Sequence, residues 1–268
     1  MRAYRVAYDG RPFHGFQRQP DVHTVEDALL DALRDLDVLA GDADAPAGYA
    51  AAGRTDAGVS AVAQTVAFEA PEWLTPAAFN SELPADVRAW ASADAPGDFH
   101  ATHDAVARVY TYHLHAPEAD AERARDALVR LSGEHDFHNL TPDDAGTVRD
   151  LDGAVERDGP FLVVRLRAGG FARQLVRRVV AVVAEVARGQ AGTDRIDAVL
   201  GDDPLAGPEG VAPAPAHPLV LTDVTYPGLD FAVDDAALAS AREVFETRRV
   251  EHATMARVTG VLADCGPP

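Results

Sequence analysis

The sequence contains no lysine, only one cysteine and no long apolar segment. The single cysteine, Cys265, cannot form a disulfide within the chain and has no companions at metal-ligand spacing, which is typical of a reducing cytoplasm. The longest apolar stretch, Val179 to Val183 with Ala184, falls far short of the roughly 20 residues that a membrane-spanning helix needs. Residues 1–6 alternate like a strand and lack the apolar core of a signal peptide. We therefore expect a soluble, cytoplasmic protein.

Acidic residues dominate the charge of the chain. The net charge is -19, and all 24 basic residues are arginine. An acidic balance ordinarily argues against a nucleic-acid partner, because phosphates are bound by basic surfaces. This composition is, however, halophile-like, and in about 1 M salt the Debye length is only about 3 Å, so that net charge describes the solvent and not the ligand. The useful signal is then where arginines cluster, at Arg11 and Arg18, at Arg54, at Arg108, and at Arg173, Arg177 and Arg178.

The first part of the chain alternates strand and helix patterns. With 268 residues and 47% hydrophobic content, the chain is not disordered and can form one or two domains. Residues 2–8 read as a strand, and the Gly- and Pro-punctuated loop over 9–23 is long enough to be functional. Thr24 is placed to cap a helix. Further strands are predicted at 48–52, at 62–68 and near 87–91, with a short helix at 75–83.

The same pattern then begins again. Strands are predicted at 107–115, in a hairpin of 149–156 with 161–167, and at 219–226, and helices at 119–131 and 171–188. A last helix is expected over 234–263. The sequence therefore predicts an N-terminal half over 1–104, a second half over 105–226, and a helical extension over 227–268.

The turn from Gly53 to Gly58 is the most informative segment. It places Arg54, Thr55 and Asp56 between two glycines, which allow positive φ and the close approach of another backbone. Such a turn can present Asp56 to a cleft. The same residues also suit an ordinary polar turn, because Thr and Asp side chains bond to nearby backbone groups.

This turn resembles the signature of the TruA family of tRNA pseudouridine synthases, Gly-Arg-Thr-Asp-Ala-Gly-Val-His. Seven of its eight residues match, and Ser60 takes the place of the histidine. The resemblance extends from about residue 2 to residue 226. Further blocks similar to the family's occur in the family's order on both sides of the turn, at residues 8–10, 13–20, 24–26, Asn80 with 83–87, 99–101, 108–112, 131–137, 171–178 and 214–217. The chain is accordingly identified as a member of this family.

The resemblance implies an α/β fold, the pseudouridine synthase fold, in which two ferredoxin-like halves form a continuous mixed sheet with a central active-site cleft. It also implies an isomerase that converts uridine to pseudouridine in the anticodon stem-loop of tRNA, at positions 38 to 40 in tRNA numbering. The expected partners are tRNA and a second copy of the chain in a homodimer. Neither a cofactor nor a metal ion is expected.

The family's functional residues map onto particular positions of this chain. The catalytic aspartate falls on Asp56, its counter-ion on Arg177 and the active-site tyrosine, which stacks on uracil, on Tyr110. Arg54 matches the arginine that helps to extrude the target nucleotide. Phe16, Gln17 and Arg173 complete the expected substrate-binding set, with Arg173 and Arg177 on one face of the helix predicted over 171–188.

Other interpretations stay open at this point. A non-catalytic RNA-binding protein would keep the basic surface without needing Asp56 and Arg177 together. An acid–base hydrolase would need a second carboxylate roughly 5 to 9.5 Å from Asp56, and no motif supplies one. Nor does the sequence decide whether Asp56 attacks the base, attacks C1′ or removes a sugar proton.

Overall fold

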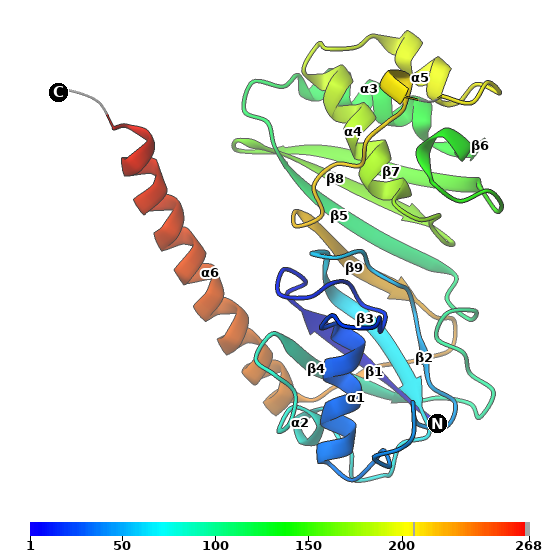
Figure 1. The fold of residues 1–268 in the computed structure, drawn as a ribbon, viewed down its shortest axis with the longest axis vertical. Helices are drawn as coiled ribbons and strands as arrows, with labels where there is room; N and C mark the ends of the chain where they lie inside the picture. Colours follow the sequence, from blue (N-terminus) through cyan, green and yellow to red (C-terminus); the bar gives the residue numbers. More distant parts are fainter. Residues whose placement is uncertain (206, 266–268) are drawn as a thin grey trace.

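The computed structural model describes residues 1–205 and 207–265. Within them, ten strands form one sheet in the order β10-β4-β1-β3-β9-β5-β8-β7-β6, with β2 beside β3. Figure 1 shows α1 lying across the first strands of the chain and α3, α4 and α5 gathered over the later ones. None of the described helices is long and apolar enough to cross a membrane.

The first half of the chain has the order of a ferredoxin-like unit. Its elements are β1 (Arg2–Tyr8), α1 (Val25–Asp35), β2 (Ala50–Ala51), β3 (Ser60–Phe68), α2 (Pro76–Phe79) and β4 (Val87–Asp94). Strands β4, β1, β3 and β2 lie side by side in that order. Along the chain these elements follow one another as β1-α1-β2-β3-α2-β4, which is the order of a βαββαβ unit.

The second half repeats this arrangement. Its elements are β5 (Ala107–His115), α3 (Ala121–Leu131), β6 (Gly133–Asp136), the short 3-10 helix η1 (His138–Leu140), β7 (Val148–Asp158), β8 (Phe161–Ala168), α4 (Leu175–Ala187), α5 (Thr193–Val199), the 3-10 turn η2 (Gly207–Glu209) and β9 (Leu219–Thr225). Strands β9, β5, β8 and β7 are neighbours in that order. Both halves therefore place their last strand beside their first.

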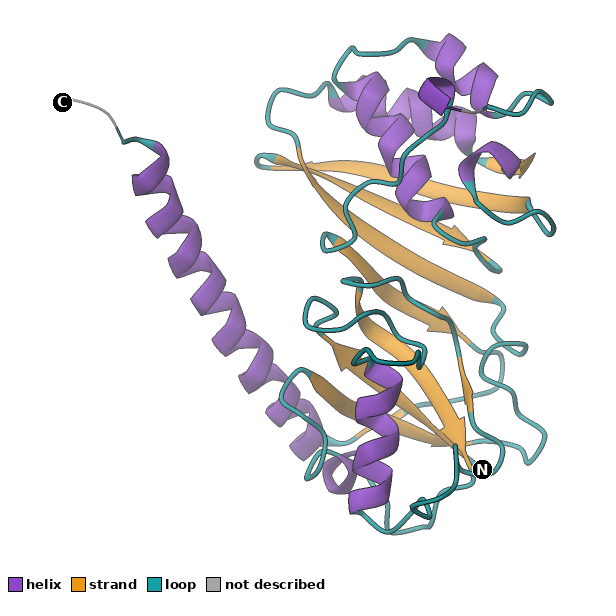
Figure 2. Cartoon of the chain, viewed as in Figure 1, coloured by secondary structure: helices purple, strands orange, loops and turns teal. Residues whose placement is uncertain are grey.

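The two halves join into one sheet through β3 and β9. These strands run parallel, with Ser60 opposite Val220 and Ala61 opposite Leu221. The other strand pairs are antiparallel, so the sheet is mixed (Figure 2). Buried side chains from both halves form one continuous core. The predicted fold, two ferredoxin-like halves in a continuous mixed sheet, is confirmed.

Local signals account for several boundaries. Thr24 caps α1: its hydroxyl accepts a hydrogen bond from Asp27 N, and the Asp27 carboxylate accepts one from Thr24 N, which satisfies two free amides of the helix start. The strand predicted over 107–115 is found with those bounds. The strand predicted over 48–52 is shorter, with two residues, because Gly48 takes a φ of +69°. Strand β6 and helix α5 were not predicted.

The expected helix over 171–188 begins later than predicted. Helix α4 starts at Leu175, because Gln174 adopts the left-handed region with a φ of 61°. Residues before it bond to another loop instead of to the helix, with Arg173 N donating to an Asp143 carboxylate oxygen at 2.8 Å and Thr141 Oγ1 donating to Arg173 O at 3.0 Å. Arg173 therefore lies in the turn before α4, and the prediction that it shares a helix face with Arg177 is wrong.

The last segment leaves the body of the molecule. After β10 (Ala232–Val233), which pairs with β4, helix α6 (Asp235–Ala263) projects outward (Figure 1). Only Ala237 and Ala241 of this helix are buried. A helix of 29 residues is about 44 Å long, and its residues 249–263 are all exposed, so the last part of α6 extends past the body of the molecule.

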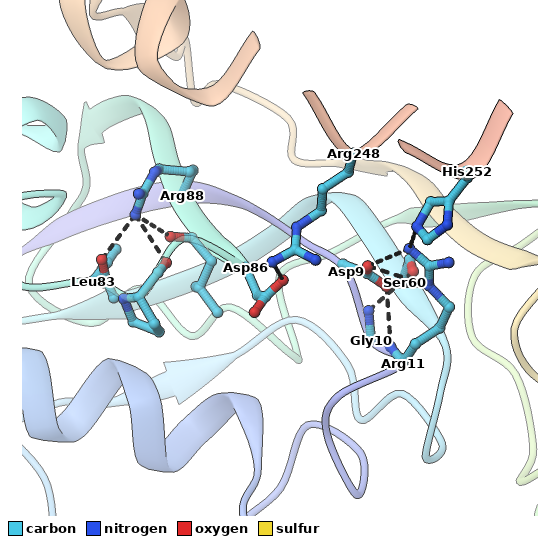
Figure 3. A network of polar contacts seen from close by, with 11 residues as sticks. Asp9, Gly10, Arg11, Ser60, Leu83, Asp86, Arg88, Arg248 and His252 are labelled. Atoms are coloured by element: carbon cyan, nitrogen blue, oxygen red, sulfur yellow. Dashed lines mark hydrogen bonds and ion pairs between the residues drawn. The ribbon is translucent and has the colours of Figure 1, made fainter. Parts of the chain in front are cut away.

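Polar contacts fasten the middle of α6 to the end of β1 (Figure 3). Arg248 forms an ion pair with Asp86. His252 Nε2 lies 2.6 Å from Arg11 Nη2, and Arg11 Nε donates to the Asp9 carboxylate at 2.8 Å. Helix α6 thus contacts the start of the loop over residues 9–23, and the same loop bonds to the Asp56 turn through Phe16 N and Thr55 O.

Candidate active site

The Asp56 turn connects β2 to β3 and is held by hydrogen bonds on several sides. Gln64 Nε2 donates to Gly53 O at 2.7 Å, and Phe16 N donates to Thr55 O at 3.0 Å. The Thr55 hydroxyl is buried and shares a hydrogen bond of 2.8 Å with the phenol of Tyr8 on β1. The backbone around Asp56 is therefore fixed by neighbouring elements, while its carboxylate stays partly exposed, with 31% of the side-chain surface accessible.

The loop over residues 9–23 packs directly on this turn. A side chain at Gly10 would place Cβ 2.0 Å from Val59 O, closer than real atoms approach, so glycine is required there. Gly10 N also donates to Ser60 Oγ at 3.0 Å. Ser60, which stands at the histidine position of the family signature, thus anchors the loop beside the turn.

Asp56 meets Arg177 across the cleft. Arg177 Nη1 donates to Asp56 Oδ2 at 2.8 Å, and Arg177 Nε donates to Ala214 O at 2.7 Å. Ala214 belongs to the proline-rich segment before β9, and its own N–H donates to Arg177 O at 3.1 Å. The guanidinium, with 15% of its side-chain surface exposed, is therefore held on one side by backbone and presents its other edge to the carboxylate.

Tyr110 lies on β5 beside this pair. Its side chain is buried, and its ring meets the edge of Phe171 with centroids 5.2 Å apart. Burial raises the pKa of the Tyr110 phenol to about 12, with a smaller lowering effect from Arg108 and a smaller raising effect from the negative charge of Asp56. The phenol is therefore protonated throughout the physiological pH range and keeps its O–H as a donor.

A cleft of about 1670 Å³ brings these groups together. All the residues expected at the site line it: Phe16, Gln17, Arg54, Asp56, Tyr110, Arg173 and Arg177. Arg54 and Gln17 are exposed, whereas the Phe16 side chain is buried and packs near Tyr8, with ring centroids 6.2 Å apart. The ring of Phe16 packs in the core beneath the loop over residues 9–23. Because the ring is buried, only the backbone of Phe16 could contact RNA.

Arginines give this cleft a local charge opposite to that of the whole chain. Five line it: Arg54, Arg108, Arg149, Arg173 and Arg177. Arg173 pairs with Asp143 at 3.2 Å, and Arg149 donates to Val148 O at 2.7 Å. Among the residues that the structure describes, Arg54 is the cleft arginine that makes no hydrogen bond or ion pair, which leaves its guanidinium available to a ligand.

Sequence reasoning missed several residues that shape the site. Tyr8 and Gln64 hold the turn through hydrogen bonds to Thr55 and Gly53, and Phe171 packs on Tyr110. Tyrosine and phenylalanine are ordinary core residue types, and the sequence gives no sign that the amide of Gln64 is buried. Arg108 is different, because an arginine beside alternating apolar and aromatic residues of a strand is a visible signal. The histidines of the chain form no metal centre with acidic residues or Cys265 in the described ranges, where no three such groups lie together.

Comparison with known proteins agrees with this geometry. A family model described as tRNA pseudouridine synthase matches residues 127–227. The tRNA pseudouridine synthase A of Natronomonas pharaonis is 63% identical over 265 residues, which cover 98% of this chain and 99% of the relative. The protein of the same name from Halobacterium salinarum is 61% identical over 264 residues, covering 98% of each chain. That of Methanosarcina acetivorans is 37% identical and covers 96% of each.

Fold, cleft and relatives define the class as the pseudouridine synthases, which are isomerases. Within this class, the chain belongs to the TruA family of tRNA pseudouridine synthases.

Burial of the tyrosines leads to a pH prediction. All six tyrosines have a raised pKa because of burial, to about 12 for Tyr4, Tyr110 and Tyr226. Phenols of the unfolded chain ionise near pH 10. The stability that these groups contribute is therefore fully present below about pH 10 and is lost as pH rises through the folded values. We expect phenolate absorbance, followed at constant high salt, to appear only together with unfolding. Substantial phenolate at pH 10 with native circular dichroism would contradict this.

Proposed function

We propose that this chain isomerises uridine to pseudouridine in the anticodon stem-loop of tRNA, at positions 38 to 40. The observation that carries the proposal is the pairing of Asp56 with Arg177 at 2.8 Å, in a cleft that also holds Tyr110. A protein that only binds RNA has no need of a carboxylate held against a guanidinium in this way. Relatives named tRNA pseudouridine synthase A support tRNA as the substrate, and the position within tRNA rests on the resemblance of the motifs.

The reaction breaks the N1–C1′ bond of uridine, turns the base and joins C5 to C1′, while C5 loses a proton and N1 gains one. Asp56 is proposed as the catalytic group, acting as the carboxylate that its ion pair with Arg177 stabilises. Tyr110 is proposed to stack on the uracil and to hold it through the turn, with its phenol protonated. Its fixed position on β5, against Phe171, suits a platform that must not move with the base.

The target nucleotide must leave its stack to reach Asp56. Arg54 is proposed to assist, because it lines the cleft, is exposed, and its guanidinium makes no hydrogen bond or ion pair within the described chain. Only Thr55 separates it from Asp56 in the chain, so a nucleotide displaced by Arg54 would meet the carboxylate. Gln17 and Arg173, also exposed on the cleft, are proposed to contact the RNA around it.

The activity is tested by incubating purified protein with unmodified tRNA in high potassium chloride and mapping pseudouridine by chemical labelling and primer extension. We expect product at positions 38 to 40 with the wild type and strongly slowed formation of product with Asp56→Asn, which keeps the size of the side chain and removes its charge. Asp126→Asn, on the exposed surface of α3, serves as the matched control and should retain wild-type activity. Absence of product with the wild type, or full product with Asp56→Asn, would disprove the assignment.

We further propose that the protein works as a homodimer in which α6 contacts a second copy. Beyond Ala241 this helix has no buried residue, and it exposes five large apolar side chains near its end, at Val250, Met255, Val258, Val261 and Leu262. The helix and the sheet enclose an apolar groove of about 920 Å³, lined by Val62, Val220 and Phe245 among others. Apolar surface of this extent on a projecting helix is typical of an interface. A symmetric pair would cover the helix of each copy with the body of the other.

This proposal predicts the mass of the particle in solution. Light scattering during size-exclusion chromatography at high salt should give the mass of two chains for the wild type. The double substitution Val258→Glu with Val261→Glu should give the mass of one, because charges would then have to be buried. Val129→Glu, at an exposed apolar position of α3, should stay dimeric. A wild-type monomer, or an unaffected dimer in the double variant, would exclude α6 as the interface.

A further inference from the structure

One buried arginine, Arg108, contacts both segments that carry the catalytic pair. Its side chain comes from β5 and only 8% of the residue is exposed. Nε and Nη2 donate to Ala52 O at 2.9 and 2.6 Å, and Nη1 donates to Gly169 O at 2.6 Å. Nη2 also donates to Thr102 O at 2.8 Å. The guanidinium thus makes four hydrogen bonds, all of them to backbone carbonyls.

These carbonyls stand at particular places in the chain. Ala52 immediately precedes the turn that carries Asp56, and Gly169 opens the segment that leads into α4 and Arg177. Thr102 is itself bonded to strand β2, which leads into the Asp56 turn, because its hydroxyl donates to Ala51 O at 2.5 Å. Arg108 therefore fixes the start of the Asp56 turn and the start of the Arg177 segment to one rigid strand.

The charge of Arg108 has no carboxylate partner among residues 1–205 and 207–265. A buried charge without a counter-ion is costly, and proteins usually pair it. Here carbonyl dipoles satisfy the guanidinium instead. Its planar fork suits acceptors that lie in different directions, whereas the ammonium of lysine offers three donors at a single point. Arg108 thus fixes the positions of the backbone segments it bonds, although burying its unpaired charge lowers the free energy of unfolding.

We propose that Arg108 is a positioning residue for the reaction: it holds the turn of Asp56 and the segment of Arg177 at a fixed separation, and thereby sets the distance between the carboxylate, its counter-ion and Tyr110. This inference rests on the proposed function. Because a misplacement of about 1 Å can slow an enzymatic step by about 10²-fold, a tether of this kind matters to the rate more than to the binding of tRNA.

The tether can be tested without reference to activity. Hydrogen exchange by mass spectrometry compares wild type, Arg108→Gln and Arg157→Gln. Arg157 is a matched control, because it also bonds to backbone carbonyls, those of Ala116 and Ala119, but joins only segments of the second half. Arg108→Gln should speed exchange in residues 52–58 and in residues 169–174 together, and Arg157→Gln in neither. Unchanged exchange in either segment with Arg108→Gln would refute the tether, whether or not the wild type makes pseudouridine.

The effect on the reaction is measured by single-turnover kinetics beside tRNA binding. Arg108→Gln should lower the rate constant by about 10²-fold with unchanged affinity for tRNA, and Arg108→Lys, which keeps the charge and some donors, should fall between it and the wild type. Arg157→Gln should keep the wild-type rate. An affinity loss as large as the rate loss would show Arg108 to be a phosphate ligand, and an unchanged rate would show the tether to be without consequence. If wild type itself forms no pseudouridine, the proposed function fails and the exchange experiment alone decides the tether.

Discussion

The ion pair between Asp56 and Arg177 is the contact on which the site depends, because its two residues are 121 positions apart and come from different halves of the fold. The parallel pairing of β3 with β9 is what brings them together. It joins the strand that follows the Asp56 turn to the strand that follows the proline-rich segment, and Ala214 of that segment holds Arg177 in place. A carboxylate that is covered by bound RNA loses its water, and a fixed guanidinium at hydrogen-bond distance compensates for that loss.

The whole chain is strongly acidic, whereas the cleft is rich in arginine, and the two properties have different physical reasons. A net charge of -19 suits solubility, whereas the cleft gathers arginines whose donors are mostly engaged by carbonyls and carboxylates. Long-range attraction to phosphate is weak at molar salt, where screening acts within about 3 Å. If the protein works at such salt, recognition of RNA would depend on contacts at close range, and Arg54, which makes no hydrogen bond or ion pair within the described residues, is proposed to supply one. Backbone tethers of the kind made by Arg108 are little affected by salt because they are buried.

Much of the fold was predictable from local patterns and from the ordered motifs. The strand over 107–115 and the Thr24 cap follow from alternation and capping chemistry, and the two halves follow from the resemblance. The start of α4 was not predictable, because Gln174 takes a left-handed conformation that tertiary hydrogen bonds of Arg173 and Thr141 support. The motif indicated which residues gather at the cleft, but not what holds them. Carbonyl acceptors such as those of Ala52 and Gly169 leave no trace in a sequence, so the contacts of Arg108 required the structure.

The central claim, that Asp56 and Arg177 act as one unit across the two halves, is tested most directly by a double-mutant cycle on the single-turnover rate of pseudouridine formation. Asp56→Asn, Arg177→Met and the double variant are compared with wild type under the same salt. The account predicts that the double variant is no slower than the slower single variant, because removal of either partner already disables the pair. Losses that multiply, with each substitution acting as though the other residue were absent, would contradict it.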